Sequence, residues 1–133
     1  MSISEFEKCF CGREKTYKIC CGEIHLGLKN PSCAEDLMRS RYSAFVLGLG
    51  DYLNNSHHIN TRNESEKEAI ENWAKSVKWI ELKVINSTLG TEKDEIGTVE
   101  FKAYFKQGLF KKVIHENSTF KKVDGRWYYW GSI

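Results

Sequence analysis

The chain has 133 residues, a formal net charge of +2, and apolar and charged fractions of 41% and 29%. This length and balance are ordinary for one globular domain that buries its own core, and no run of about eighteen apolar residues is present to span a membrane. The charge lies too close to neutral for the basic face that nucleic-acid binding needs. The N-terminal residues include acids and no apolar segment, so we expect no secretory signal and a cytoplasmic location.

Four of the five cysteines gather in the segment CFCGREKTYKICCG, residues 9–22, called the cysteine segment below. Zinc takes four tetrahedral ligands, and thiolate is among those it prefers. In the spacing C-x-C-x8-C-C, a tight turn holds the first pair and a loop can bring the second pair opposite. Disulfides are rare in the cytosol, and a redox pair is more typical as C-x-x-C. The spacing therefore predicts structural zinc at Cys9, Cys11, Cys20 and Cys21, with another metal or a redox use as the alternatives.

His25 is a further residue near this cluster that could act as a ligand. It follows Cys21 by four residues, and imidazole is a common zinc ligand. Four thiolates already complete the set, so we expect His25 to lie outside it. Basic residues around the cysteines would offset the negative charge of a zinc ion with four thiolates and favour the thiolate form; they are Lys8, Arg13, Lys15 and Lys18.

Two helices are expected after a linker that contains the only proline of the chain. Apolar residues recur at helical spacing over about 34–54, with Ser32 or Cys33 as the N-cap and a break at the glycines near residue 48. The segment ESEKEAIENWAKSVKW, residues 64–79, predicts a second amphipathic helix.

The rest of the chain alternates between apolar and polar residues with the period of two that indicates β-strands. Four strands are expected, in the segments WIELKVIN (79–86), EIGTVEFKAYFK (95–106), LFKKVIHENSTFKKV (109–123) and GRWYYWGS (125–132). Asp124-Gly125 between the last two is a hairpin signal. Helices followed by a meander of strands predict an α+β fold with an antiparallel sheet.

The alternation also predicts which strand residues share a face. In the first strand these are Ile80, Leu82 and Val84. In the second strand they are Val99, Phe101, Ala103 and Phe105.

The cysteine segment resembles the SEC-C motif, the zinc-binding tail known from the preprotein translocase ATPase SecA. The family pattern C-x-C-G-S-G-K-x-Y-K-x-C-[CH]-G is matched at Cys9, Cys11, Gly12, Lys15, Tyr17, Lys18, Cys20, Cys21 and Gly22. The departure is Arg13-Glu14, where the family has Ser-Gly, and it leaves every ligand in place. The resemblance implies a bound zinc ion and, as in SecA-type tails, a zinc knuckle that docks a protein partner.

Nearly all of the chain resembles the YchJ family of bacterial SEC-C proteins. The matching stretches are AEDLMRSRYSAFVLGLGDYL, GTVEFKAYF, HENSTF and GRWYYWGS. The resemblance implies a cone-shaped domain like those of the nuclear-transport-factor-2 (NTF2) superfamily, in which helices pack on a strongly curved antiparallel sheet. His58 aligns with the histidine of the family segment T-W-H-P-x-T-R, whose tryptophan and proline are missing here. The family sharpens the fold more than the function.

Domains of this superfamily often hold a pocket between the sheet and the helices, so polar residues on an apolar strand face are candidates for a ligand site. Glu116 and Ser118 share one face of the third strand with Ile114 and Phe120. A desolvated Glu116 could act as a general base. We expect an ion pair with Arg39 or Arg41 to hold it instead.

Arg39, Arg41 and His58 complete the pocket candidates. The two arginines are two residues apart on a helix, so they point to different faces. An inward arginine could bind a carboxylate ligand with two hydrogen bonds, although an internal ion pair needs only Glu116. A histidine at a helix end is favoured electrostatically without any function.

We expect a SEC-C-like zinc motif with its linker in residues 1–30 and an NTF2-like domain in residues 31–133. The sequence holds no recognisable catalytic set, which favours a binding protein over an enzyme. The favoured function is a protein-binding module in which the zinc knuckle docks a partner. The alternative is a small-molecule-binding domain or a lyase-type or isomerase-type enzyme that uses the pocket of the cone.

Overall fold

The computed structural model describes residues 7–133, so residues 1–6 of the expected zinc-motif domain lie outside the described part. Helices come first and strands follow, which confirms the predicted α+β class. The elements are η1 (Tyr17–Ile19), α1 (Cys21–His25), α2 (Ala34–Leu47), α3 (Gly50–Asn55), η2 (Glu64–Glu66), α4 (Lys67–Ser76), β1 (Lys78–Leu89), β2 (Ile96–Gln107), β3 (Phe110–Val123) and β4 (Arg126–Ser132). None of the helices in residues 7–133 combines the length and the apolar character that a bilayer crossing demands.

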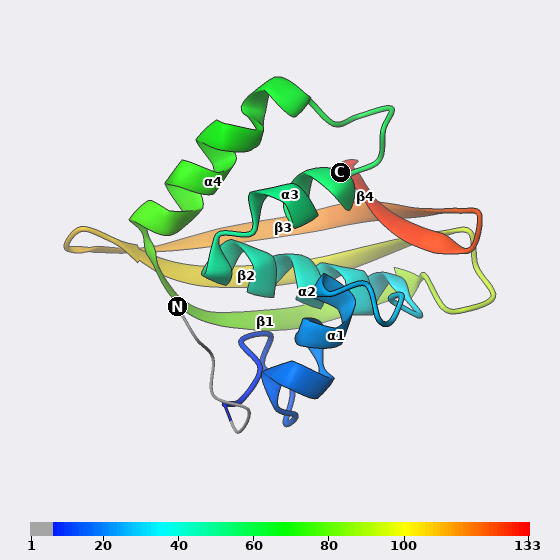
Figure 1. Ribbon diagram of the computed structural model, residues 1–133, viewed down its shortest axis with the longest axis horizontal. Helices are drawn as coiled ribbons and strands as arrows, with labels where there is room; N and C mark the ends of the chain where they lie inside the picture. The colour runs from blue at the N-terminus through cyan, green and yellow to red at the C-terminus, as the bar shows by residue number, and fades with distance from the viewer. Residues whose placement is uncertain (1–6) are drawn as a thin grey trace.

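The four strands form one antiparallel sheet in the order β1-β2-β3-β4. Figure 1 shows α2 against one face of this sheet, with α3 and α4 on the same side of the sheet and α1 beside α2. Helix α2 contacts the sheet through β1, β2 and β4 and also contacts each of the other three α-helices. It is therefore the central element around which the cysteine segment, the sheet and the remaining helices are arranged.

Helix α2 ends at a glycine in the left-handed conformation. Gly48 has φ +69°, and its N–H group donates to the carbonyls of the last helical turn, a geometry that glycine adopts without the steric cost of a Cβ. The chain turns directly into α3, so the predicted break near residue 48 is confirmed. At the other end Cys33 is the N-cap, in extended conformation and without a side-chain hydrogen bond.

The core lies between α2 and the inner face of the sheet. The predicted inner face of β2 is confirmed, because Val99, Phe101, Ala103 and Phe105 are all buried. The first three pack with Leu82 of β1, Phe120 of β3, Trp127 of β4 and a set of α2 residues: Ala34, Leu37, Met38 and Tyr42. The four cysteines form a second, separate buried cluster.

The predicted face of β1 is wrong at its first residue. Ile80 is 45% exposed, whereas Trp79 packs against the core. Trp79 pairs with Phe105 and Glu81 with Tyr104, so Ile80 is an extra residue between two adjacent pairs. Such a bulge turns the residues before it to the opposite face from the one that strict alternation predicts.

The hairpin between β3 and β4 forms as predicted. Asp124 and Gly125 have φ values of +50° and +79°, and two positive φ values in succession are the mark of a type I′ turn. The turn between β1 and β2 is shorter than predicted because β1 extends to Leu89, three residues beyond its predicted end.

Candidate metal centre and cone cavity

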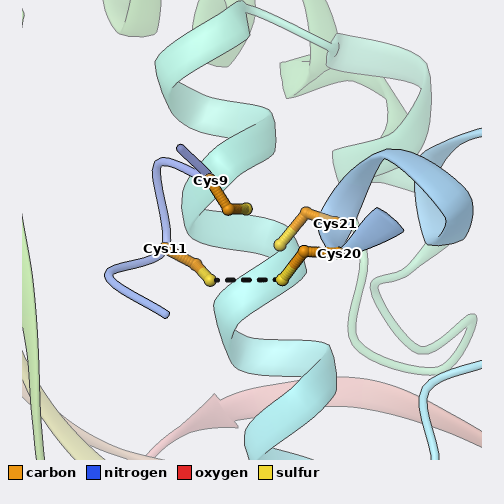
Figure 2. A group of neighbouring side chains, drawn as sticks. All are labelled: Cys9, Cys11, Cys20 and Cys21. Carbon is orange, nitrogen blue, oxygen red and sulfur yellow. Dashed lines mark hydrogen bonds between the residues drawn. The ribbon is translucent and has the colours of Figure 1, made fainter. Parts of the chain in front are cut away.

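The cysteine segment brings four sulfur atoms together through a short backbone framework. The Cys9 N–H group donates to the Lys15 carbonyl at 2.8 Å, which closes the turn that carries Cys9 and Cys11. Cys20 precedes α1 and Cys21 is its first residue. Figure 2 shows the four side chains converging from these two backbone segments in front of α2.

The geometry of the four thiols fits a tetrahedral metal ion. All four Sγ atoms lie within 4.8 Å of one another, and the Cys11 and Cys20 Sγ atoms are 3.8 Å apart. A zinc ion with Zn–S bonds of about 2.3 Å would separate its ligands by about 3.8 Å. All five cysteines lie in the described part of the chain and all are free thiols, so the four clustered cysteines could hold a metal.

The thiols lie too close together for all of them to be charged without a cation. Hydrogen bonds from Cys11 and Cys21 hold the pKa of Cys9 far below its ordinary value. Hydrogen bonds with Cys11 and Cys9, together with burial, raise the pKa of Cys21. Burial and the nearby charge on Cys11 raise the pKa of Cys20 to about 12. A divalent cation among the sulfurs would remove this mutual repulsion.

Side chains of α2 hold the cysteine segment against the rest of the molecule. The buried hydroxyl of Ser43 lies 3.7 Å from the Cys9 Sγ atom. The Arg39 guanidinium donates to the Cys11 carbonyl at 2.6 Å. Arg13, the departure from the SEC-C pattern, forms ion pairs with Glu35 and Asp36 at the start of α2. The structure thus places Arg39, a pocket candidate, at the cysteine segment and not in the cavity.

His25 engages both of its ring nitrogens away from the sulfur atoms. Its Nε2 atom lies 2.8 Å from the Ser40 carbonyl oxygen, and its Nδ1 atom lies 2.6 Å from the Tyr17 hydroxyl. A carbonyl only accepts, so Nε2 carries the hydrogen and Nδ1 accepts from Tyr17. Burial lowers the pKa of His25, which keeps this neutral form. Neither nitrogen is left to bind a metal ion in this arrangement.

A cavity of about 290 Å³ lies between the helices and the inner face of the sheet and is partly open to solvent. We call it the cone cavity. Most of its wall is apolar, and aromatic rings come from α2, α4 and the strands. The lining residues are Met38, Arg41, Tyr42, Phe45, His57, Ile70, Trp73, Trp79, Phe101, Ala103, Ile114, Glu116, Phe120 and Tyr129.

Arg41 is the cation of the cone cavity. Its Nη1 atom donates to the Leu53 carbonyl at 2.8 Å and to the Ser56 hydroxyl at 2.7 Å, and the guanidinium lies 4.6 Å from the centre of the Tyr129 ring. Burial lowers the pKa of Arg41 to about 10, so the side chain stays charged at neutral pH. Among residues 7–133, no carboxylate lies within ion-pair distance of it.

Glu116 is the acid of the same cavity, and the predicted ion pair with an arginine is wrong for the described residues. Its carboxylate accepts a hydrogen bond from the Ser118 hydroxyl at 3.1 Å, and no ion pair with Arg39 or Arg41 forms. Arg39 pairs instead with Glu35 at 2.9 Å. Ser118 itself is fully buried behind Glu116. Two opposite charges therefore line one cavity without neutralising each other directly.

The histidine that lines the cone cavity is His57 and not the pocket candidate His58. His57 lines the cavity and packs edge-on against Tyr129. Burial and the charge of Arg41 lower its pKa to about 4, so it is neutral at pH 7. His58 packs against Tyr128 and Trp130 instead, and its backbone N–H group donates to the Tyr129 carbonyl. The two residues differ because the chain here runs alongside β4, which sends adjacent side chains to opposite sides.

Two tryptophans, Trp73 of α4 and Trp79 of β1, form the aromatic end of the cone cavity. Trp73 and Trp79 meet edge to face with ring centres 5.6 Å apart, and both also pack against Phe105. Their spacing in the sequence is that of an ordinary core, and only the bulge at Ile80 turns Trp79 inward. No local signal distinguishes a cavity wall from a filled core.

Comparison with known proteins matches the two parts of the chain separately. Residues 33–132 match the family model described as the middle NTF2-like domain of YchJ, and residues 7–23 match the SEC-C motif. A UPF0225 protein of Vibrio vulnificus is 42% identical over 123 residues, which cover 91% of this chain and 71% of that protein. A UPF0225 protein of Streptomyces coelicolor is 38% identical over 121 residues, which cover 91% of this chain and 90% of that protein.

Two solved structures share the fold over nearly the whole chain. The solution structure of a SEC-C motif containing protein from Rhodopseudomonas palustris has a TM-score of 0.84 and 35% identity, and it covers 94% of this chain and 96% of that one. The crystal structure of a SEC-C motif containing protein from Psychrobacter arcticus has a TM-score of 0.76 and 33% identity, with 95% and 81% covered.

Proposed function

The chain belongs to the YchJ family, UPF0225, which joins a SEC-C motif to an NTF2-like domain, and we propose that it is a small-molecule-binding protein whose ligand occupies the cone cavity. The observation that carries the proposal is the cavity itself. Its volume of about 290 Å³, its aromatic wall and its few polar side chains match the usual character of ligand sites.

A cavity-filling variant tests this proposal with a neutral probe. The fluorescent probe N-phenyl-1-naphthylamine should bind the protein saturably at one site. Ile114 lines the cavity, whereas its neighbour Val113 lies on the outer face and is 49% exposed. Ile114→Trp should weaken binding at least tenfold, and the matched variant Val113→Trp should leave it unchanged. Equal binding by both variants would show that the probe sits elsewhere and would refute the proposal.

The proposal includes zinc as the ion held by the cysteine segment. Four thiolates with no further ligand are typical of closed structural zinc sites, and the SEC-C match covers the whole ligand set. Zinc binding requires reduced thiols, a condition met in the cytoplasm, where we propose that the protein works. The division into a zinc motif in residues 1–30 and a cone in residues 31–133 is part of the same proposal.

A second candidate function is that the zinc-loaded motif docks a protein partner. The observation in its favour is an apolar group of residues exposed to solvent around the motif: Ile19 is 57% exposed, and Leu26 and Leu28 are each 75% exposed. Exposed basic residues lie near this apolar group in the sequence, namely Lys15 and Lys29. Such a surface suits a partner that is acidic and partly apolar.

Surface substitutions test the docking function without disturbing the metal. The double variant Leu26→Glu/Leu28→Glu should lose partner proteins in a pull-down and keep its metal content. Leu109→Glu is the matched control, because Leu109 is 91% exposed in the turn between β2 and β3. An identical set of partners for both variants would count against docking at this surface.

A further inference from the structure

We infer that the cone cavity selects a zwitterionic ligand with an apolar body, a free amino acid or a close analogue, whose carboxylate binds Arg41 and whose ammonium group binds Glu116. The inference rests on the proposed function and names the chemical class of its ligand. Three features carry it: the free donor edge of Arg41, the balance of charge in the cavity, and the separation of its polar and aromatic ends.

The first feature is the state of the Arg41 guanidinium. Its Nη1 atom already makes two hydrogen bonds, to the Leu53 carbonyl and the Ser56 hydroxyl. A guanidinium has five N–H donors, so the edge formed by Nε and Nη2 remains. Among residues 7–133 this edge has no hydrogen-bond partner. It is the edge that binds a carboxylate with two parallel hydrogen bonds, and the two fixed bonds on Nη1 hold it in position.

The second feature is the balance of charge. Arg41 and Glu116 are the two charged side chains that line the cavity, and His57 is neutral at pH 7 because its pKa lies at about 4. A ligand with only a carboxylate would place two negative charges, its own and that of Glu116, beside the single guanidinium of Arg41. A ligand with only an ammonium group would leave the donor edge of Arg41 unpaired. A zwitterion pairs both of these charges, and such pairing offsets the cost of holding a charge partly out of water.

The third feature is the distance between the two ends of the cavity. Glu116 lies opposite Phe101, and Trp79 lies opposite Phe105. Four residues of β2 separate these two levels, which is roughly 13 Å of strand. The aromatic end, built around Trp73 and Trp79, therefore lies beyond the polar end and can receive an apolar side chain. A large aromatic side chain fits this reach better than a small one.

Three probes of similar shape separate the contributions of the charges. L-phenylalanine carries both charges, 3-phenylpropionate lacks the ammonium group, and 2-phenylethylamine lacks the carboxylate. In calorimetric titrations of the full chain at pH 7, L-phenylalanine should bind about tenfold more tightly than either analogue, the size expected for one charge-assisted hydrogen bond. Glu116→Gln should abolish the advantage of L-phenylalanine over 3-phenylpropionate. Glu100→Gln, on the outer face of β2, is the control and should preserve it.

A second variant tests the carboxylate contact independently. Arg41→Lys keeps the positive charge but removes the edge that donates two parallel hydrogen bonds. It should therefore weaken the binding of L-phenylalanine and 3-phenylpropionate and leave the binding of 2-phenylethylamine unaffected. Tighter binding of 3-phenylpropionate than of L-phenylalanine would overturn the inference. So would binding of N-phenyl-1-naphthylamine in the cavity with no binding of the three charged probes. Failure of the naphthylamine itself would instead overturn the proposed function.

Discussion

The Ser43 hydroxyl shows how one side chain can tie the metal site to the core. It is fully buried on α2 and lies 3.7 Å from the Cys9 Sγ atom. A hydroxyl that donates to a sulfur stabilises the thiolate form, which is the form that binds a metal. Arg39, one helical turn earlier, donates to the Cys11 carbonyl. Two residues of the cone thus act directly on the ligand loop.

The metal content should depend on the four clustered cysteines alone. Cys20→Ser removes one of four ligands, and we expect native mass spectrometry to find one zinc ion per chain in the natural protein and none retained by the variant. Cys33→Ser is the matched control, because Cys33 lies outside the cluster and should keep the full zinc content. Zinc retained at full affinity by Cys20→Ser would contradict the assigned ligand set.

Ser43→Ala should weaken zinc binding without abolishing it. The loss of a hydrogen bond to a ligand typically lowers metal affinity about 10-fold or more, and the exposed Ser76 provides the control in Ser76→Ala. Competition with a chromophoric chelator measures the difference. Equal affinities of the two variants would show that Ser43 only fills space.

His57 should make the stability of the fold depend on pH. Its pKa is lowered from 6.5 to about 4 by burial and by the charge of Arg41. Between these two values the unfolded chain binds more protons than the native one, so the free energy of unfolding should fall as the pH falls from about 6.5 to 4. His57→Asn should flatten this slope in urea titrations across that range. An unchanged slope would mean that His57 takes up its proton at the same pH in the native and the unfolded protein.

At the scale of elements, the turn between β1 and β2 folds back onto the start of α2. The Ala34 N–H group donates to the Gly90 carbonyl at 2.9 Å. Gly90 has φ +74°, and its Cα atom lies so close to Gly97 that a Cβ on Gly97 would meet it at 2.4 Å. The close approach of these two glycines lets the strand pair end directly against the helix.

Gly97→Ala should therefore destabilise the protein by about 2–3 kcal/mol, because rigid backbone has to move to accept the methyl group. Gly131→Ala in β4 is the control, since nothing lies within 4 Å of a Cβ there. Chemical denaturation measures both. A loss in Gly97→Ala no larger than in the control would show that the turn can shift freely.

The sequence predicted the parts of the fold that depend on local pattern. The inner face of β2 follows from strict alternation, and the Asp124-Gly125 turn follows from backbone preference. Ile80 was placed on the wrong face because a bulge is decided by pairing with β2, which no local pattern records.

The candidate sites also differ in whether local sequence or long-range packing determines them. The four cysteines are close in sequence, so their spacing alone predicts their convergence. The expected pairing of Glu116 with an arginine required knowledge of how α2 is rotated over the sheet, which depends on packing. That rotation turns Arg39 to the cysteine segment and Arg41 to the cavity, and it leaves Glu116 bonded to Ser118.

At the scale of the molecule, the cysteine segment and the cone are two buried clusters joined along α2. Phe10 of the segment packs against the main core, and Arg13, Arg39 and Ser43 add polar contacts across the junction. The main core itself draws its residues from α2 and the sheet. The main core should therefore stay folded when the metal is removed, although it loses the contacts that the cysteine segment provides.

Chelation of the metal should loosen the cysteine segment and leave the cone folded. We expect the amide signals of residues 34–133 to stay dispersed in NMR spectra while the melting temperature falls by about 5 °C, the change expected from the loss of about 1–2 kcal/mol in a domain of this size. Restoring zinc should reverse the shift. Global unfolding on chelation would show that the core depends on the metal.

The central position of α2 has a consequence for anyone who wishes to use this domain as a scaffold. Every residue of α2 is buried or half-buried, because the sheet covers one side of the helix and the cysteine segment covers another. A chain shortened to residues 31–133 would uncover Ser43, which contacts Cys9, and the Ser40 carbonyl, which contacts His25. The SEC-C motif therefore cannot be removed without exposing part of α2. A protein that carries the motif alone, or the remaining domain alone, would need a redesigned helix surface.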